Sequence, residues 1–249
     1  MSSSHSPSYE EFTPPPVLRP FVHRFWVHLI EGPPPPEGRR LLPDGRINLV
    51  WVAGTGVRVA GPQTRYGTPL DLPRILALGA AFHPGAAARL LRTPAAAFVD
   101  DHVALDAVDP RLAERLDERL ADARDRRAAV AAFADELARA LAAAAPPDPV
   151  VRHAVGVLDR AGATVTGAAE RAAVSERELE RRFADHVGYA PKTLQRVLRF
   201  DRFVKRVADP AIGLAGAAAL AGYADQAHLS RETRRLADLT PRQLVGWQH

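Results

Sequence analysis

Residues 218–233 read AALAGYADQAHLSRET, and residues 169–183 read AERAAVSERELERRF. Both stretches contain a small residue, then a turn, then a helix-capping residue followed by a leucine and an arginine. The offset is 49 residues before the turn, from Ala169 to Ala218, and 50 after it, from Ser175 to Asp225. The chain therefore repeats one short structural unit. The matching pairs are Ala169/Ala218, Val174/Tyr223, Ser175/Asp225, Leu179/Leu229 and Arg181/Arg231.

Each copy has the features of two helices joined by a tight turn. A small residue in the first helix lets the second helix cross it closely at a steep angle. Gly222 suits a turn that needs a positive φ, and Ser175 and Asp225 are good N-caps for the second helix. Glu178 stands at the capping-box position after Ser175. The pattern predicts two helix-turn-helix units, in which the second helix typically enters the major groove of DNA.

Residues 191–208, between the two copies, are predicted to form one helix. Apolar residues recur along it at positions 194, 197, 198, 203, 204 and 207. A helix of this length spans roughly 27 Å, at 1.5 Å per residue. Two recognition helices enter successive major grooves when they lie roughly 34 Å apart, one DNA turn. We therefore predict a rigid spacer that presents both recognition helices to one face of the DNA.

The stretches GYADQAHLSRE (residues 222–232) and LTPRQL (residues 239–244) resemble the signature of AraC/XylS-type transcription regulators. The first copy of the repeat, the stretch GYAPKTL (residues 188–194) and Arg199 are similar to the same family. The resemblance covers about residues 150–247. It implies a seven-helix DNA-binding domain with two helix-turn-helix units.

The resemblance also implies which side chains face the bases, and helical geometry adds Arg182 to them. Arginine can pair with guanine and glutamine with adenine in the major groove, whereas an alanine can at most touch a thymine methyl. We expect the first recognition helix to dominate affinity, because it is capped and rich in arginine, and the second to tune site choice. The predicted DNA-binding residues are Arg177, Glu180, Arg181 and Arg182 in the first unit, and Gln226, Ala227, Ser230 and Arg231 in the second.

Several positions depart from the family pattern. Ala173 stands where glycine is usual, Thr233 replaces an expected phenylalanine, and Asp238 replaces a glycine. Gly213 and Gly216 weaken the helix that supports the second recognition helix. The second unit is therefore expected to be less rigid or to contribute less affinity, unless neighbouring side chains compensate.

Charge and composition agree with a DNA-binding C-terminal half. Residues 1–147 contain 17 basic and 17 acidic residues, whereas residues 148–249 contain 16 basic and 12 acidic residues. All of the net charge of +4 thus lies in the C-terminal part, which indicates contact with a polyanion or a chance asymmetry of a solvated surface. The absence of cysteine excludes disulfides and thiolate chemistry and fits a reducing cytoplasm. No apolar run approaches the roughly 18 residues of a membrane helix.

Residues 17–105 read mostly as short strands separated by Gly/Pro turns, which predicts a small antiparallel sheet or barrel. Residues 1–16 are rich in Ser and Pro and are expected to be a flexible tail, not a secretory signal. The run Pro146-Pro147-Asp148-Pro149 marks a boundary between a domain at 1–147 and a helical domain at 148–249. The predicted fold class is α+β, with flanking helices around the sheet and an all-α C-terminal domain.

The N-terminal half resembles a sensor-type domain found ahead of such DNA-binding pairs in bacteria, whose ligand is not generally defined. The resembling stretches are FWV (25–27), LPDG (42–45) with NLV (48–50), and Gly79 with FHPG (82–85). Trp26, Trp51 and Phe82 are candidates to line an effector pocket, or are plain core.

Residues 110–145 predict two amphipathic helices or one bent helix. Leucines recur every four residues at 112, 116 and 120, and a second apolar stripe follows at 130, 133, 137 and 141. This stripe packs on the sheet or on a second copy of the chain. A homodimer is therefore one possible assembly.

Catalytic and metal-binding constellations are weak. His83 has no metal-ligand partner nearby in the sequence, and His23 and His28 are expected on opposite faces of a strand. Asp100-Asp101-His102 reads as a solvated turn. DNA-repair methyl acceptors with this type of DNA-binding domain need a cysteine, and no phosphate-binding glycine motif is present. We expect neither an enzyme nor a cofactor.

These features predict a cytoplasmic, sequence-specific transcription regulator that binds a double-stranded DNA operator. A small-molecule effector or a partner at the N-terminal domain is expected to control it, and RNA polymerase is a further partner if it activates. One alternative is an N-terminal enzyme that the helical domain targets to DNA; another is a constitutive or architectural regulator with no ligand.

Overall fold

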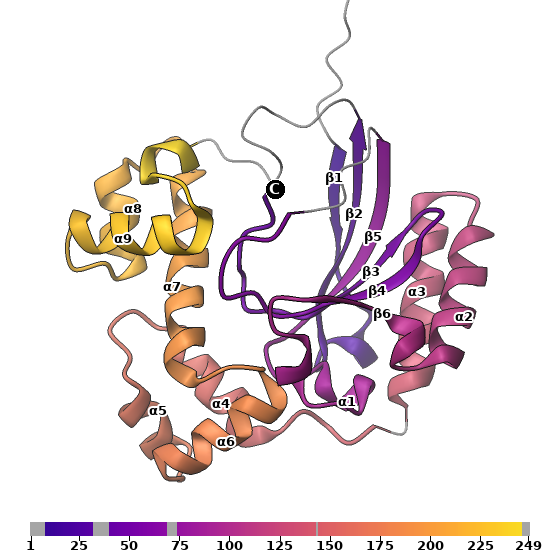
Figure 1. Ribbon diagram of the computed structural model, residues 1–249, viewed down its shortest axis with the longest axis horizontal. Helices are drawn as coiled ribbons and strands as arrows, with labels where there is room; N and C mark the ends of the chain where they lie inside the picture. The colour runs from indigo at the N-terminus through magenta and orange to yellow at the C-terminus, as the bar shows by residue number, and fades with distance from the viewer. Residues whose placement is uncertain (1–7, 32–39, 69–73, 143, 246–249) are drawn as a thin grey trace, which may run out of the picture.

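In the computed structural model, residues 8–31, 40–68, 74–142 and 144–245 are described. Their N-terminal part forms a six-stranded antiparallel sheet in the order β1-β2-β5-β3-β4-β6 (Figure 1). The alternation of apolar and polar residues along the strands gives the sheet two different faces. The strands are β1 (Ser8–Phe12), β2 (Val22–Glu31), β3 (Asn48–Val52), β4 (Gly56–Ala60), β5 (Arg74–Phe82) and β6 (His102–Ala104).

One face of the sheet packs against α2 (Pro110–Ala121) and α3 (Arg126–Leu141). The apolar stripe of these two helices is buried in the same core as the sheet, so the stripe packs on the sheet and not on a second copy. Asp125 caps α3 and separates it from α2. Buried Glu136 of α3 joins the two helices through ion pairs with Arg115 and Arg119 of α2, and it also pairs with Arg139 of its own helix.

The flexible tail expected at residues 1–16 is wrong for Ser8–Phe12, which form the edge strand β1 paired with β2. Residues 1–7 lie outside the described part, as do residues 32–39. The 3₁₀ turn η1 (Pro16–Leu18) then places fully buried Leu18 under the sheet. The solvated turn expected at Asp100-Asp101-His102 is wrong for His102, which is the first residue of β6. The remaining short elements of this domain are α1 (Ala88–Leu91), η2 (Ala95–Phe98) and η3 (Leu105–Ala107).

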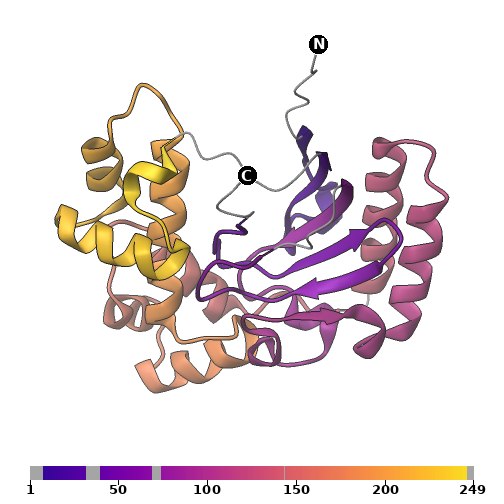
Figure 2. The same cartoon turned by 45° about the horizontal axis from the view of Figure 1, so that its top comes forward.

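The described C-terminal residues are helical and contain two cores. The first core joins α4, α5, α6 and the start of α7, and the second joins the rest of α7 to α8 and α9. These helices lie on the opposite side of the molecule from α2 and α3 (Figures 1 and 2). The elements are α4 (Pro149–Leu158), α5 (Val165–Arg171), α6 (Glu176–His186), α7 (Pro191–Val207), α8 (Leu214–Ala221), α9 (Gln226–Ala237) and η4 (Pro241–Leu244).

The predicted α+β class is confirmed, with an antiparallel sheet domain and an all-α domain around one long helix. Within the described ranges, no helix has both the length and the apolar character needed to span a bilayer.

Candidate nucleic-acid interface

The two repeated units share the same backbone turn. In the first unit the N–H of Val174 donates to Ala169 O and the N–H of Ala173 donates to Glu170 O. In the second unit the N–H of Tyr223 donates to Ala218 O, and that of Gly222 to Ala219 O. These bonds repeat at the offset of 49 residues found in the sequence, so α5–α6 and α8–α9 are two copies of one helix-turn-helix.

The recognition helices α6 and α9 also begin in the same way. The Ser175 hydroxyl accepts from the N–H of Glu178 at 3.2 Å, and the Asp225 carboxylate accepts from the N–H of His228 at 2.6 Å. Both predicted N-caps are thereby confirmed. The carboxylate of Glu178 does not return to Ser175 as a capping box requires, because it binds two arginines of its own helix.

The turn of the first unit contains a strained residue. Ala173 has a φ of +54°, at the position where the second unit has Gly222 with a φ of +91°. The left-handed region crowds the Cβ atom of an alanine against the backbone, whereas glycine adopts it freely. Asp238, at the C-terminus of α9, likewise has a φ of +53°. Two of the departures from the family pattern therefore occupy backbone positions that favour glycine.

The predicted readers of the first unit differ in how free they are. The side chains of Arg177 and Glu180 are exposed, and within the described residues Arg177 has no ion pair. Arg181 is exposed as well, but its guanidinium binds Glu178 at 2.8 Å and 3.0 Å and lies 3.7 Å from Asp185. A base that contacts Arg181 must compete with these carboxylates.

Arg182 forms ion pairs with Asp148, the N-cap of α4, and with Glu178 of its own helix. Its Nη1 donates to Asp148 Oδ2 at 2.6 Å and its Nε donates to Glu178 at 2.7 Å. Asp148 is buried and at the same time caps α4, accepting from the N–H groups of Val150 and Val151. Although burial opposes ionisation, those N–H groups and the Arg182 guanidinium together hold the pKa of Asp148 below its usual value. This contact anchors α6 to α4.

The second recognition helix is anchored through a different residue. Arg199 of α7 makes a bidentate ion pair with the buried carboxylate of Glu232, at 2.9 Å and 3.2 Å, and its guanidinium lies over the ring of Tyr223. The predicted readers therefore lie on the opposite side of α9. Gln226, Ala227 and Arg231 are exposed and Ser230 is half-buried.

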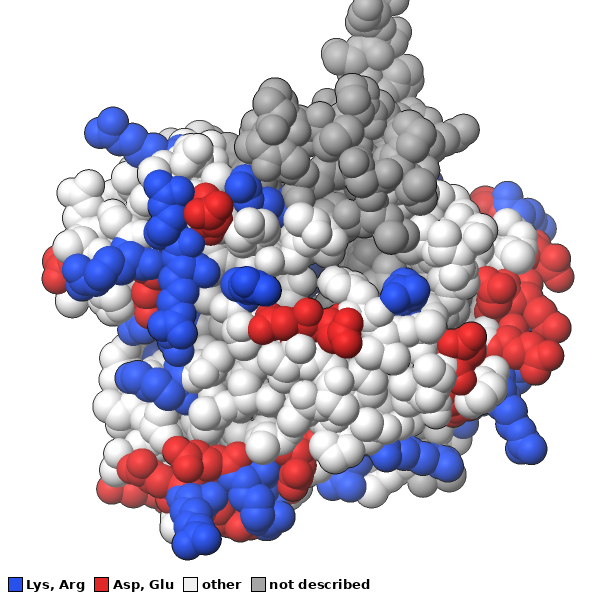
Figure 3. Space-filling model, in the orientation of Figure 1, with Lys and Arg blue, Asp and Glu red and all other residues white. Residues whose placement is uncertain are grey.

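The two recognition helices differ in charge. Helix α6 has three arginines and four acidic residues, net −1, whereas α9 has three arginines and one glutamate, net +2. The space-filling view shows the same contrast: blue and red side chains alternate over α5 and α6, and blue side chains gather over α7 and α9 (Figure 3). The positive charge of the domain is therefore concentrated around the second unit.

Sequence reasoning missed part of this basic surface. Arg196 of α7 and Arg235 of α9 interact electrostatically, and burial followed by the charge of Arg235 lowers the pKa of Arg196. Arg196 stands four residues after Lys192, and Arg235 four residues after Arg231. Cations at this spacing share one face of a helix. This spacing is the sequence pattern that could have indicated contacts with DNA phosphates.

The three aromatic residues suggested for an effector pocket do not converge. Phe82 is fully buried in the core, and Trp51 lies on the helix-covered face, where its Nε1 donates to Asp117 at 2.8 Å. Trp26 alternates with core residues of β2, so it lies on the other face, with its ring directly over Gly79. Trp51 and Phe82 are therefore core residues.

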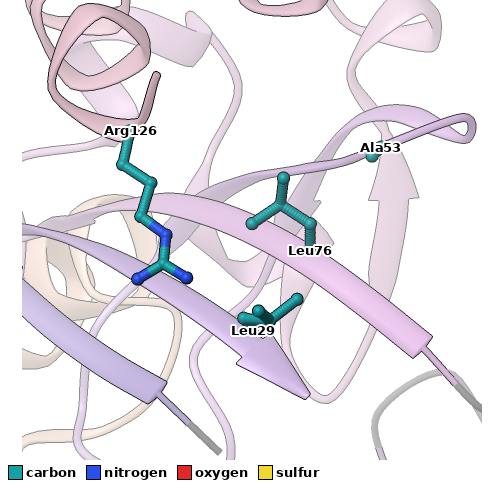
Figure 4. A pocket seen from close by; sticks show the side chains of 4 residues that line it. All are labelled: Leu29, Ala53, Leu76 and Arg126. Carbon is teal, nitrogen blue, oxygen red and sulfur yellow. The ribbon is translucent and has the colours of Figure 1, made fainter. Parts of the chain in front are cut away.

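A small opening lies at another place in the N-terminal domain. It has a volume of about 440 Å³ and is lined by Leu29, Ala53, Leu76 and Arg126. In the close view the Arg126 side chain extends from α3 over the strands toward Leu29 and Leu76 (Figure 4). The lining thus combines apolar side chains with one guanidinium.

Two of the described histidines of the N-terminal domain contact each other. His83 contacts the ring of His23 at a centroid distance of 5.3 Å, and both side chains have lowered pKa values, that of His23 to about 4, chiefly because of burial and then because of Arg46. His28 contacts Tyr9 instead. Across the described part of the chain, no three His, Cys, Asp or Glu residues are grouped so as to hold a metal ion.

Comparison with known proteins agrees with this geometry. Residues 168–245 match a helix-turn-helix domain, which confirms the resemblance to AraC-type regulators. Residues 10–104 match a domain of unknown function (DUF6597). No curated protein matches the chain. Two parts of the chain thus match separate family models, and the C-terminal match is to a domain type of DNA-binding transcription regulators.

Proposed function

We propose that this chain, in which an AraC-type helix-turn-helix domain follows a domain of unknown function, regulates transcription by reading one DNA sequence with both units. The observation that carries this proposal is the pair of matched turns, one in each unit on either side of α7, each followed by a capped helix with exposed predicted readers. Helix α7 has 17 residues and spans roughly 26 Å at 1.5 Å per residue. This length supports entry of both helices into neighbouring major grooves.

The two units are proposed to contribute different parts of the binding energy. Arg177 and Arg181 of α6 and Gln226, Ser230 and Arg231 of α9 contact base edges, with Glu180 and Ala227 beside them. Arg182 holds α6 in place through Asp148. The charge distribution favours the second unit, with α7, as the main source of attraction to phosphates, the reverse of the order expected from the arginine content of α6.

Selection of bound duplexes from a random DNA pool by the intact protein tests the proposal. We expect one enriched sequence whose binding weakens steeply with salt. Arg231→Ala is expected to weaken the selected duplex by about 1–3 kcal/mol and to relax preference at one base pair. Arg111→Ala, which removes an exposed arginine from α2, is the matched control and leaves binding unchanged. A pool without enrichment contradicts sequence-specific binding.

Control of the regulator by a small molecule at the N-terminal domain is part of the same proposal. The opening beside Arg126 supports it, since an apolar lining with one guanidinium suits a small apolar carboxylic acid. Titration of the protein with a series of such acids, read by isothermal calorimetry, tests this location. Binding that Arg126→Ala does not weaken would place the effector elsewhere. Dimerisation, and contact with RNA polymerase by an activator, stay predictions.

A further inference from the structure

The N-terminal domain contacts both helix-turn-helix units. At the second unit, the N–H of Tyr66 donates to Leu236 O at 2.6 Å, and Leu42 packs on the core of α7, α8 and α9. At the first unit, Val99 packs on the core of α4, α5 and α6. An added Cβ atom on Gly188, which follows α6, would lie 3.0 Å from the carbonyl oxygen of Ala95. One domain thus spans the two units.

The turn at Gly45 makes another close contact with the DNA-binding domain. This residue has a φ of +80°, and a Cβ atom added to it would lie 2.9 Å from the Leu194 side chain. Leu194 is buried in the first turn of α7, the helix shared by both units. The LPDG turn that the sequence singled out therefore packs closely against α7, and a Cβ atom at Gly45 would require the Leu194 side chain to shift.

A second glycine makes the equivalent contact with α4. Gly85, in the FHPG stretch, has a φ of +86°, and an added Cβ atom would lie 2.7 Å from Val151 Cγ1. Val151 is buried in the core of the first unit. Both glycine turns of the N-terminal domain noted in the sequence thus approach the DNA-binding domain closely.

Charged groups surround the contact with α7. Asp201 of α7 is 8% exposed and binds Lys205 at 2.6 Å. The charges of Asp44 and Arg46, on either side of Gly45, act on Asp201. Asp44 also lies 3.7 Å from Arg24 of β2. A continuous set of contacts therefore runs from the sheet through this turn to α7.

We propose that the N-terminal domain is a brace that holds the two helix-turn-helix units in the arrangement that binds DNA. The proposal rests on the proposed function. The turns of the N-terminal domain contact α4, α7 and the C-terminal end of α9. The predicted reading residues Arg177, Gln226 and Arg231 stay exposed. The docked domain thus leaves the DNA face open, and its contribution is to fix the relative orientation of α6 and α9. Loss of docking lowers the population of the binding-competent arrangement and weakens binding by the same factor.

Single methyl groups test the brace. Gly45→Ala and Gly85→Ala each place a Cβ atom against the DNA-binding domain, whereas Gly54→Ala imposes the same strain, at a φ of +80°, with no atom within 4 Å. The probe is the duplex that the wild-type chain selects from a random pool. We expect about tenfold weaker binding for the first two variants, a difference of about 1.4 kcal/mol, and less than about twofold for the control.

A distance measurement tests docking without DNA. Because the chain has no cysteine, Arg127→Cys on α3 and Ala208→Cys at the end of α7 provide a unique exposed pair for spin labels. We expect a narrow distance distribution in this background and after Gly54→Ala, and a broad one after Gly45→Ala. Adding Val151→Ala to Gly85→Ala removes the colliding methyl group and is expected to restore the narrow distribution.

The outcomes separate the brace from the proposed function. Wild-type affinity in both glycine variants overturns the brace, and tighter binding overturns it in favour of masking by the N-terminal domain. If the wild-type chain selects no duplex, the proposed function fails, and the spin-label distances still decide whether these turns hold the domains together. A broad distribution in the background without a glycine replacement contradicts the docking itself, and an unchanged narrow distribution in Gly45→Ala and Gly85→Ala contradicts the role of these two turns in it.

Discussion

The two helix-turn-helix units have the same backbone and different supports. Their turns are closed by equivalent hydrogen bonds and their recognition helices are capped at equivalent positions. The first unit holds α6 through Arg182 and Asp148, the N-cap of α4, and the second holds α9 through Arg199 of α7 and Glu232. A duplicated fold can therefore keep its local geometry while each copy is fixed to the rest of the molecule by its own ion pair.

The second unit is expected to depend most on its anchor. Glu232→Ala removes a carboxylate that is 8% exposed and leaves the Arg199 guanidinium without its partner between α7 and α9. Breaking a buried ion pair from one side costs about 3 kcal/mol. We expect this loss in the free energy of unfolding, measured by urea denaturation followed by circular dichroism. Glu180→Ala, an exposed glutamate of the other recognition helix, should stay within about 0.5 kcal/mol of wild type.

The first unit is expected to lose less stability than the second when its own anchoring carboxylate, Asp148, is removed. Asp148→Ala removes the cap of α4 and the partner of Arg182, which is 30% exposed and can turn to water or to Glu178. We expect a loss of about 2 kcal/mol in urea denaturation near neutral pH. A loss as large as that of Glu232→Ala would contradict the difference between the two anchors.

The pH dependence of the same variant provides a second measurement. The folded-state pKa of Asp148 is lowered, so its contribution is present above the unfolded-state value of 3.8 and disappears as the pH falls below it. Between about pH 5 and pH 2, wild type should lose more stability than Asp148→Ala. If the free energy of unfolding falls with pH in parallel for the two proteins, the charge of the Asp148 carboxylate does not stabilise the contact between α4 and α6.

The repeat, its caps and the long spacer helix were predictable because neighbouring residues determine them. The side chains of Ser175 and Asp225 accept from N–H groups only three residues further along the chain. Contacts between distant parts of the chain were not predictable. Arg182 reads as an exposed arginine of a recognition helix until the fold places Asp148, 34 residues earlier, beside it. Strand β1 has a polar sequence next to a Ser/Pro-rich stretch, and it is a strand because β2 pairs with it.

The turns of the two units are expected to respond in opposite directions to exchange of alanine and glycine. Gly222→Ala places a Cβ atom in the left-handed region and should lower the free energy of unfolding by about 1.5 kcal/mol. Ala173→Gly removes the same strain from the first unit, and the greater freedom of glycine in the unfolded chain offsets part of the gain, which leaves about 0.5 kcal/mol. Urea denaturation of both variants measures the difference. Destabilisation by Ala173→Gly would mean that the turn of the first unit accommodates alanine without strain.

A further predicted difference concerns one hydroxyl in each unit. Thr233 of α9 is fully buried where the family pattern has phenylalanine, and no hydrogen-bond partner of its Oγ1 lies within the described residues. Thr166 of α5 is exposed, and its Oγ1 donates to Glu176 at 2.6 Å. Thr233→Val keeps the shape of the side chain and removes an unpaired polar group, so we expect a gain of about 1 kcal/mol in the free energy of unfolding.

Thr166→Val is the matched control, because the same replacement there removes a hydroxyl that is bonded and solvated. We expect a loss of up to about 0.5 kcal/mol for this variant, and urea denaturation of both variants measures the difference. If Thr233→Val also destabilises, the hydroxyl has a partner, such as an internal water, and the core of the second unit is better satisfied than its side chains indicate. A gain instead identifies Thr233 as a position where the second unit is less stable than it could be. The first unit has no such loss there, because Phe183 and Leu179 are both fully buried apolar residues.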